Sequence, residues 1–147
     1  MKIKNPVISE FMNLKSYAII GVSAKRKKFG NEILKQLARR GFAVFPIHRE
    51  AMLIDGIPCY PDIQNLPEKP EGIILVIHPD ETEKVVKDIV SAGIRYVWMQ
   101  QGAESKTAIE YCSNHGIKVV SGECLLMFIN KPGFPHNLHH WVWGLRN

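Results

Sequence analysis

The stretch Tyr17–Phe42 reads YAIIGVSAKRKKFGNEILKQLARRGF, and it predicts a buried strand, a tight turn and a helix in succession. The strand is the apolar run 17–20, the turn begins at Gly21, and apolar residues at the helical period follow Gly30. The N-terminal amides and positive end of the helix would face the turn, an arrangement that binds phosphate groups. The turn lacks the dinucleotide pattern G-x-G-x-x-G because Ser23 stands at its third position, so the ligand must be inferred from other residues.

Strand and helix patterns alternate along most of the chain. Further apolar strands are predicted at 43–47, 73–77, 96–99 and 118–120, with a leading helix at 6–14 and helical patterns between most of the strands. Residues 50–70 contain four prolines and predict a loop with one short strand and one helical turn. Such alternation implies a parallel sheet covered on both faces. We therefore predict an α/β fold, a doubly wound, Rossmann-like, mostly parallel five-stranded sheet with helices on both faces.

Length and composition predict one domain, spanning 1–147, with a core at 14–124 and a C-terminal extension at 125–147. No apolar run approaches the roughly 20 residues that cross a bilayer, so no membrane partner is expected. The N-terminal residues are too polar for a signal peptide, and the three cysteines are odd in number and far apart. Reduced thiols and a cytoplasmic location are therefore expected.

The formal charge of +5 suits an anionic partner, either a phosphorylated ligand or a nucleic acid. In a doubly wound sheet the ligand lies beyond the carboxyl ends of the strands. The candidate cofactor-binding residues lie at or just after those ends: Gly21, Val22, Ser23, Ala24, Lys25, Pro46, His48, Arg49, Ile77, His78, Pro79, Met99, Gln100 and Gln101. This mixture of glycine, hydroxyl, basic and amide groups suits phosphates and an adenine-ribose rather than bond making.

The end of the second predicted strand argues against NAD. A dinucleotide fold would place Asp or Glu there to hold the ribose hydroxyls, whereas this chain has His48 and Arg49, with Glu50 one residue later. Positive charge at this point favours a ribose that carries its own phosphate, as in NADP or coenzyme A. A simple polar strand end is an equally acceptable interpretation of the composition.

Motifs along most of the chain resemble those of a known family. The residues that carry the resemblance are Ile20–Ser23, Gly41 with Phe42, Val44–Pro46, Gly56 with Tyr60, Trp98–Gly102, Val119 with Val120, and Cys124. On these motifs the chain, from about Leu14 to Cys124, resembles the small CoA-binding domain proteins. It is similar to the CoA-binding Rossmann domain of the succinyl-CoA synthetase alpha subunit.

The resemblance implies a role for each part of the cleft. The backbone of 21–24 would hold a CoA phosphate with help from the Ser23 hydroxyl, Arg49 would lie near the phosphorylated ribose, and 77–79 with 99–101 would line the rest. In the family that the chain resembles, Asn is often found at the position of His48, and the ligases carry their phosphorylated histidine on a following domain that is not expected in this chain. The resemblance therefore implies non-catalytic binding of coenzyme A or an acyl-CoA.

Other interpretations stay open. An NADP-type oxidoreductase-like module is the alternative, and nucleic-acid binding through the basic run 25–28 is a less favoured one. No catalytic group of residues is evident, since the candidate nucleophiles Ser23, Cys112 and Cys124 have no histidine at a spacing that predicts contact. In the tail, His136, His139 and His140 are candidate metal ligands, although a helix that anchors a homo-oligomer contact is favoured there.

Overall fold

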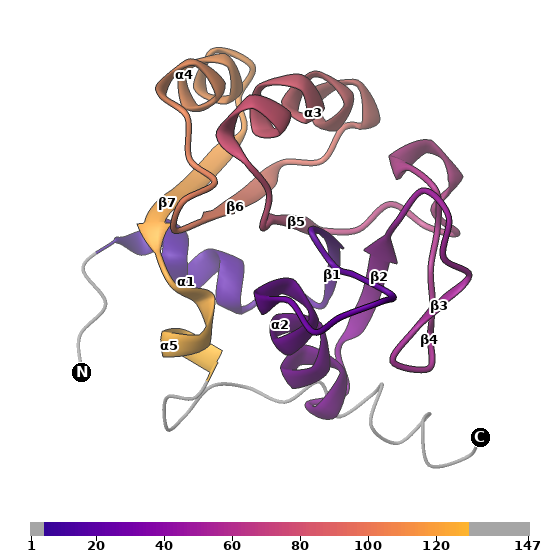
Figure 1. Ribbon diagram of the computed structural model, residues 1–147. Helices are drawn as coiled ribbons and strands as arrows, with labels where there is room; N and C mark the ends of the chain where they lie inside the picture. Colours follow the sequence, from indigo (N-terminus) through magenta and orange to yellow (C-terminus); the bar gives the residue numbers. More distant parts are fainter. Residues whose placement is uncertain (1–4, 130–147) are drawn as a thin grey trace.

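The structure is a computed structural model that describes residues 5–129, and its centre is a parallel sheet of five strands in the order β2-β1-β5-β6-β7 (Figure 1). The strands are β1 (Ser16–Ile20), β2 (Ala43–Ile47), β5 (Gly72–Leu75), β6 (Tyr96–Gln100) and β7 (Lys118–Glu123). Strand β1 pairs with β2 on one side and with β5 on the other, so the strand order reverses at β1. The predicted doubly wound α/β fold is confirmed.

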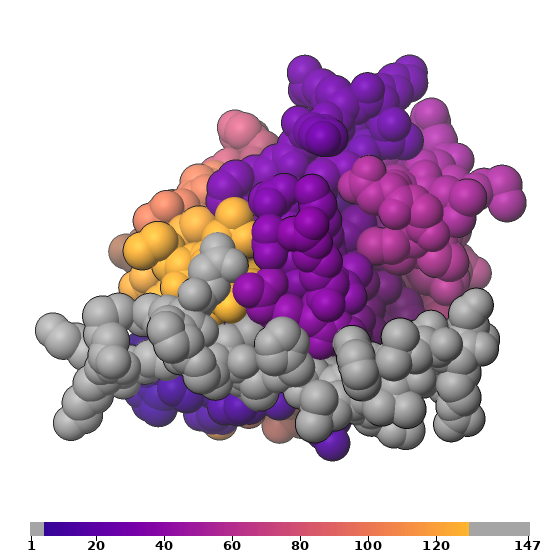
Figure 2. Space-filling model, turned by 90° about the horizontal axis from the view of Figure 1, so that it is seen from below, coloured from indigo at the N-terminus to yellow at the C-terminus, as the bar shows by residue number. Residues whose placement is uncertain are grey.

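Helices cover both faces of the sheet (Figure 1). The helices are α1 (Pro6–Met12), α2 (Phe29–Arg39) and α5 (Leu125–Ile129) on one face, and α3 (Pro79–Ala92) and α4 (Lys106–Asn114) on the other. Strand side chains alternate between the two cores, since Tyr17 and Ile19 join the core of α1, α2 and α5 while Ala18 joins that of α3 and α4. Figure 2 shows α2 beside α5 on the first of these faces.

The third strand of the sheet is shorter than the apolar run 73–77 predicts. It ends at Leu75, and the Val76 amide still donates a hydrogen bond of 2.8 Å to the Ile20 carbonyl. Two residues later His78 is the extended N-cap of α3, and Pro79 is its first residue. Proline suits that first helical position because its missing N–H would have no partner there. The predicted strand end at 77 is therefore wrong, because the chain leaves the sheet after Leu75 and begins α3 at Pro79.

The proline-rich segment 50–70 contains a hairpin that the sequence analysis missed. Two short strands, β3 (Leu53–Ile54) and β4 (Ile57–Pro58), pair antiparallel, and a single helical turn, η1 (Ile63–Asn65), follows. Asp55 and Gly56 join the strands with φ of 51° and 79°, the left-handed pair typical of a type I′ turn. The chain then returns to the sheet, where the Tyr60 amide donates to the Pro46 carbonyl at 3.0 Å. The hairpin is thus placed beside the carboxyl end of β2.

At the opposite, amino edge of the sheet, Glu10 links α1 to two strands. Its carboxylate accepts hydrogen bonds of 2.7 Å from both Lys118 Nζ and the Tyr96 hydroxyl. These two donors, Lys118 first, hold the pKa of Glu10 below its usual value of 4.5. A carboxylate with a lowered pKa stabilises the fold above its unfolded-state pKa, and the contribution disappears as pH falls through the folded-state pKa.

We therefore expect Glu10→Gln to lower the midpoint of urea unfolding at pH 7. The difference from the unmodified protein should shrink as pH falls through the lowered folded-state pKa of Glu10, and should vanish only where Glu10 is protonated in both states. Parallel urea titrations between pH 3 and pH 7 measure it. A difference that stays constant over this range would contradict the role of the carboxylate charge.

Within residues 5–129, no helix combines the length and the apolar character that crossing a membrane requires.

The predicted core position of Cys112 is confirmed, because its side chain is fully buried and burial raises the pKa of its thiol to about 11. The tail histidines His136, His139 and His140, and the oligomer contact predicted with them, lie outside the described residues.

Candidate functional site

A cleft of about 1140 Å³ lies beyond the carboxyl ends of β1, β2 and β5, where the strand order reverses. Its lining comes from the β1–α2 turn, the end of β2, the loop before η1 and the first half of α3. These residues are Ile20–Lys25, Lys28, Ile47–Ala51, Pro61–Ile63, Val76–His78, Glu81, Lys84, Val85 and Asp88. The volume lies slightly above the range of about 300–1,000 Å³ that is typical of small-molecule sites.

Two glycines allow the strand, the turn and the helix to meet closely. A Cβ on Gly21, which has φ of +118°, would lie 2.1 Å from the Val76 carbonyl oxygen of the neighbouring segment. A Cβ on Gly30, in the first turn of α2, would lie 2.3 Å from the Gly21 carbonyl oxygen. The second contact brings the N-terminus of α2 against the turn, which is the function of the third glycine in dinucleotide-binding folds. The sequence therefore achieves that packing with a different glycine spacing.

The turn is held by the side chain of Asn31. Its Oδ1 accepts the Ser23 amide at 2.9 Å, and its Nδ2 donates to the Ser23 carbonyl at 2.8 Å. The Ser23 hydroxyl in turn accepts the amides of Lys25 at 3.3 Å and Arg26 at 3.4 Å. The expectation that the backbone of 21–24 holds a phosphate therefore needs one amendment, because the Ser23 amide already has a partner.

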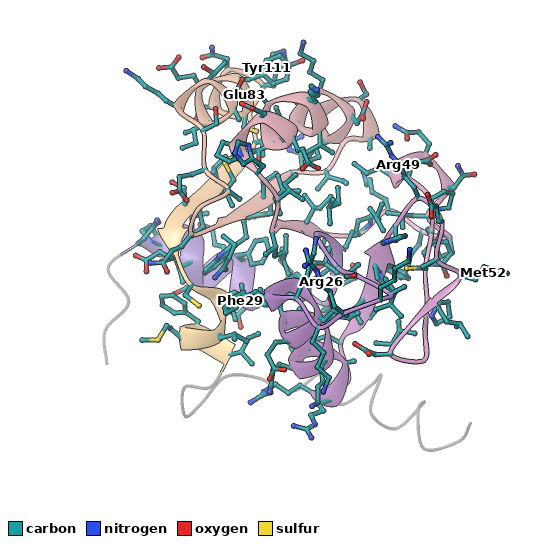
Figure 3. All side chains as sticks on the ribbon, in the orientation of Figure 1. Arg26, Phe29, Arg49, Met52, Glu83 and Tyr111 are labelled. Atoms are coloured by element: carbon teal, nitrogen blue, oxygen red, sulfur yellow. The ribbon has the colours of Figure 1, made fainter. Side chains whose placement is uncertain are left out.

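Arg49 lies two residues after the end of β2, in a loop that is held by the His48 side chain. The His48 Nδ1 accepts the amides of Glu50 at 3.1 Å and Ala51 at 3.0 Å, so the imidazole holds its own loop. Arg49 is exposed and lies near the carboxyl end of β2, whereas Arg26 lies on the loop between β1 and α2 (Figure 3). Arg49 is thus an exposed cation in the lining of the cleft, where its guanidinium can bind a phosphate.

The cleft is less positive than the run 25–28 suggests. Its lining includes four basic residues, Lys25, Lys28, Arg49 and Lys84, and four acidic ones, Glu50, Asp62, Glu81 and Asp88. The β1–α2 side supplies two of the cations, and α3 supplies two of the carboxylates. Lys25 and Lys28 therefore lie on a lining segment without an acidic residue, whereas Arg49 adjoins Glu50 and Lys84 lies between Glu81 and Asp88.

Nine of the fourteen predicted binding residues line the cleft: Gly21, Val22, Ser23, Ala24, Lys25, His48, Arg49, Ile77 and His78. The other five are Pro46, Pro79, Met99, Gln100 and Gln101, which are not among the lining residues. Met99 is fully buried in the core of α3 and α4. Gln100 is buried and its Oε1 accepts the Leu125 amide at 3.0 Å, while Gln101 Nε2 donates to the Gly122 carbonyl at 3.2 Å. In this structure the two glutamines join β6 to the segment from β7 to α5.

Several lining residues were not predicted. Glu81, Lys84 or Val85, and Asp88 recur at the helical period, so a helical-face analysis of the segment after His78 could have found them. Asp62 and its neighbours depend on the course of the 50–70 segment, for which the sequence carries no comparable signal. Asn31 follows Gly30 and precedes an apolar stripe, where a polar residue normally indicates only the start of a helix.

Within residues 5–129, no group of three or more histidine, cysteine or acidic side chains could hold a metal ion. Burial raises the pKa of the Cys59 and Cys112 thiols, which makes both of them poor nucleophiles at neutral pH. The cleft itself is lined by the glycine turn, four basic and four acidic side chains, and apolar walls.

The fold and the cleft together define a Rossmann-like domain with its site at the strand-order reversal. The sequence model of the CoA binding domain family matches residues 15–130, and the chain belongs to this family. The resemblance inferred from the motifs is confirmed.

Curated relatives are larger proteins. The ADP-forming acetate–CoA ligase I of Archaeoglobus fulgidus is 28% identical over 123 residues, which cover 77% of this chain and 18% of that protein. The alpha subunit of the ADP-forming acetate–CoA ligase II of Pyrococcus furiosus is 25% identical over 130 residues, covering 81% and 28%. The chain thus spans less than a third of the length of either relative.

Solved structures of similar size share the fold. A conserved hypothetical protein from Pyrococcus furiosus is 32% identical with a TM-score of 0.73, and the alignment covers 78% of this chain and 98% of that one. A hypothetical protein from Pyrococcus horikoshii has a TM-score of 0.78 at 24% identity, with 86% and 95% covered. At that identity the second likeness shows the fold alone.

Proposed function

We propose that the chain binds coenzyme A or an acyl-CoA in this cleft without catalysing a reaction on it. The observation that carries the proposal is the junction of the glycine turn with Arg49 at the strand-order reversal, in a chain of the CoA binding domain family. The turn and the N-terminus of α2 would take the pyrophosphate, since helix N-termini favour anions. Arg49 would bind the 3′-phosphate of the ribose.

The remaining walls suit the uncharged parts of the ligand. Ile47, Ile77 and Val85 give the cleft an apolar lining, against which an adenine ring or a pantetheine arm can bury surface. The names of the curated relatives describe ligation of acetate to CoA, and this chain covers only a small part of each. The proposal therefore extends to the binding of CoA and leaves the ligation reaction to those larger proteins.

Isothermal titration calorimetry with CoA and with dephospho-CoA, which lacks the 3′-phosphate, tests the proposal. We expect the unmodified protein to bind CoA more tightly. Arg49→Ala should weaken CoA binding by about tenfold or more, because a hydrogen bond to a charged group contributes about 1.5–3 kcal/mol, and should leave dephospho-CoA binding unchanged. The matched control is Arg95→Ala, which removes the same charge from an exposed arginine at the amino edge of the sheet.

Two results would contradict the proposal. An absence of binding heat with CoA, supported by an unchanged melting temperature at millimolar CoA, would reject the ligand. Tight binding of NADPH without binding of CoA would instead favour the NADP-type module, which shares the requirement for a phosphorylated ribose.

A further inference from the structure

We infer that Asn31 is a positioning residue for the ligand's pyrophosphate, and that the amides of Lys25 and Arg26, rather than that of Ser23, bind the phosphate oxygens. The inference rests on the proposed function and specifies which groups of the turn perform it. It follows from the way in which the described polar groups of the turn are already paired.

Asn31 is committed entirely to the turn and its surroundings. It is 5% exposed, although it lies within the first turn of α2 at the rim of an open cleft. Its side-chain amide hydrogen-bonds both the N–H and the carbonyl of Ser23. Its Nδ2 also donates to Asp55 Oδ2 at 3.4 Å. An asparagine amide has two N–H donors, of which one is held at 2.8 Å by the Ser23 carbonyl and the other makes the longer contact of 3.4 Å with Asp55. A buried amide with this pairing fixes the Ser23 backbone in one conformation.

The pairing decides which amides are left for a ligand. The Ser23 amide is held at 2.9 Å by a buried acceptor, so giving it up would leave the Asn31 oxygen unsatisfied and would be costly. The Lys25 and Arg26 amides are held at 3.3 Å and 3.4 Å by an exposed hydroxyl, beyond the usual range of about 2.7–3.2 Å. Lys25 lines the cleft and Arg26 is the next residue, and successive backbone N–H groups of a turn can bind an anion. A phosphate can replace the hydroxyl as their acceptor.

The Asp55 contact extends this arrangement to the β3–β4 hairpin. Asp55 lies at the hairpin tip with φ of 51°, and its carboxylate reaches the same Nδ2 that holds Ser23. The hairpin and the turn therefore meet at the Asn31 side chain, through a contact as long as those of the Lys25 and Arg26 amides.

Backbone amide NMR on the unmodified full chain tests the assignment directly. On titration with CoA, the amide protons of Lys25 and Arg26 should shift downfield and exchange more slowly with solvent, while the Ser23 amide should change little. The largest downfield shift on Ser23, with Lys25 and Arg26 unaffected, would overturn the inference. This measurement needs no variant and is unaffected by any folding defect.

Asn31→Ala tests the positioning role. Releasing Ser23 should weaken CoA and dephospho-CoA binding by the same factor of about tenfold, because both ligands carry the pyrophosphate and the loop must now be ordered on binding. This pattern differs from that of Arg49→Ala, which should affect CoA alone. Ser105→Ala is the matched control, since it removes another buried side chain that holds backbone, at the start of α4 and outside the cleft.

The outcomes separate the inference from the proposed function. Equal CoA affinity in Asn31→Ala and the unmodified protein would overturn the positioning role while leaving CoA binding intact. Equal weakening by Ser105→Ala would show that lost stability, rather than lost positioning, explains the effect. If the unmodified protein bound no CoA, both statements would fall together.

Discussion

Gly30→Ala is expected to destabilise the protein by about 2–3 kcal/mol, although alanine is the better helix former by about 1 kcal/mol. The added Cβ would lie 2.3 Å from the Gly21 carbonyl oxygen, and backbone on both sides of that contact cannot rotate out of the way. The N-terminus of α2 must therefore move away from the turn. Because that movement also displaces the proposed phosphate site, CoA binding should be lost in the fraction that stays folded.

Chemical denaturation and calorimetry on the same samples measure both effects. Gly116→Ala is the control, because Gly116 has φ of +75° and open space around it, far from the cleft lining. Left-handed strain alone should cost about 1–2 kcal/mol there and should leave CoA binding unchanged. A Gly30→Ala protein that is as stable as the unmodified one would show that α2 and the turn are not in the close contact described above.

Trp98→Ala is expected to cost about 3–5 kcal/mol of stability, the range for truncating a large buried aromatic residue. Trp98 is fully buried, and its ring lies 5.3 Å from that of Phe11 and 5.7 Å from that of Phe128, measured between centroids. Its Nε1 donates to the Glu123 carbonyl at 3.4 Å. The residue thus connects α1, β6, β7 and α5 within one core.

Urea unfolding followed by circular dichroism measures this cost. Tyr111→Ala is the control, because Tyr111 is a partly exposed residue of α4 that contacts His115 at the surface (Figure 3), and its loss should have a much smaller effect. A Trp98→Ala variant with near-normal stability and greatly weakened CoA binding would contradict the structural role. It would favour the predicted place of 99–101 in the binding cleft.

The sheet and its helices could be predicted because their signals are local. Apolar runs of the right length identified all five strands of the main sheet, and the helical period identified the helices between them. The predicted end of β5 was wrong because Val76 and Ile77 are apolar and would suit a longer strand equally well. The start of α3 at Pro79 determines where the strand ends. The β3–β4 hairpin was missed although Asp55-Gly56 is a strong turn signal, because two-residue strands are too short to show an alternating pattern.

The candidate site could also be predicted only in part. Residues that follow β1, β2 and β5 could be placed in the cleft, because the carboxyl ends of neighbouring parallel strands meet there. The same argument also placed Met99, Gln100 and Gln101 in the cleft, but they are not among its lining residues, because β6 is one strand further from the reversal and its glutamines pair with the segment that follows it. The Asn31 pairing depends on a side-chain rotamer and on a close approach that no periodicity encodes.

The internal bonding of the turn has a practical consequence for structural work on complexes. A loop whose shape is already fixed by its own hydrogen bonds loses little conformational freedom when a ligand binds. Crystals grown without ligand should therefore tolerate soaking, and the two states should superpose closely around Ser23.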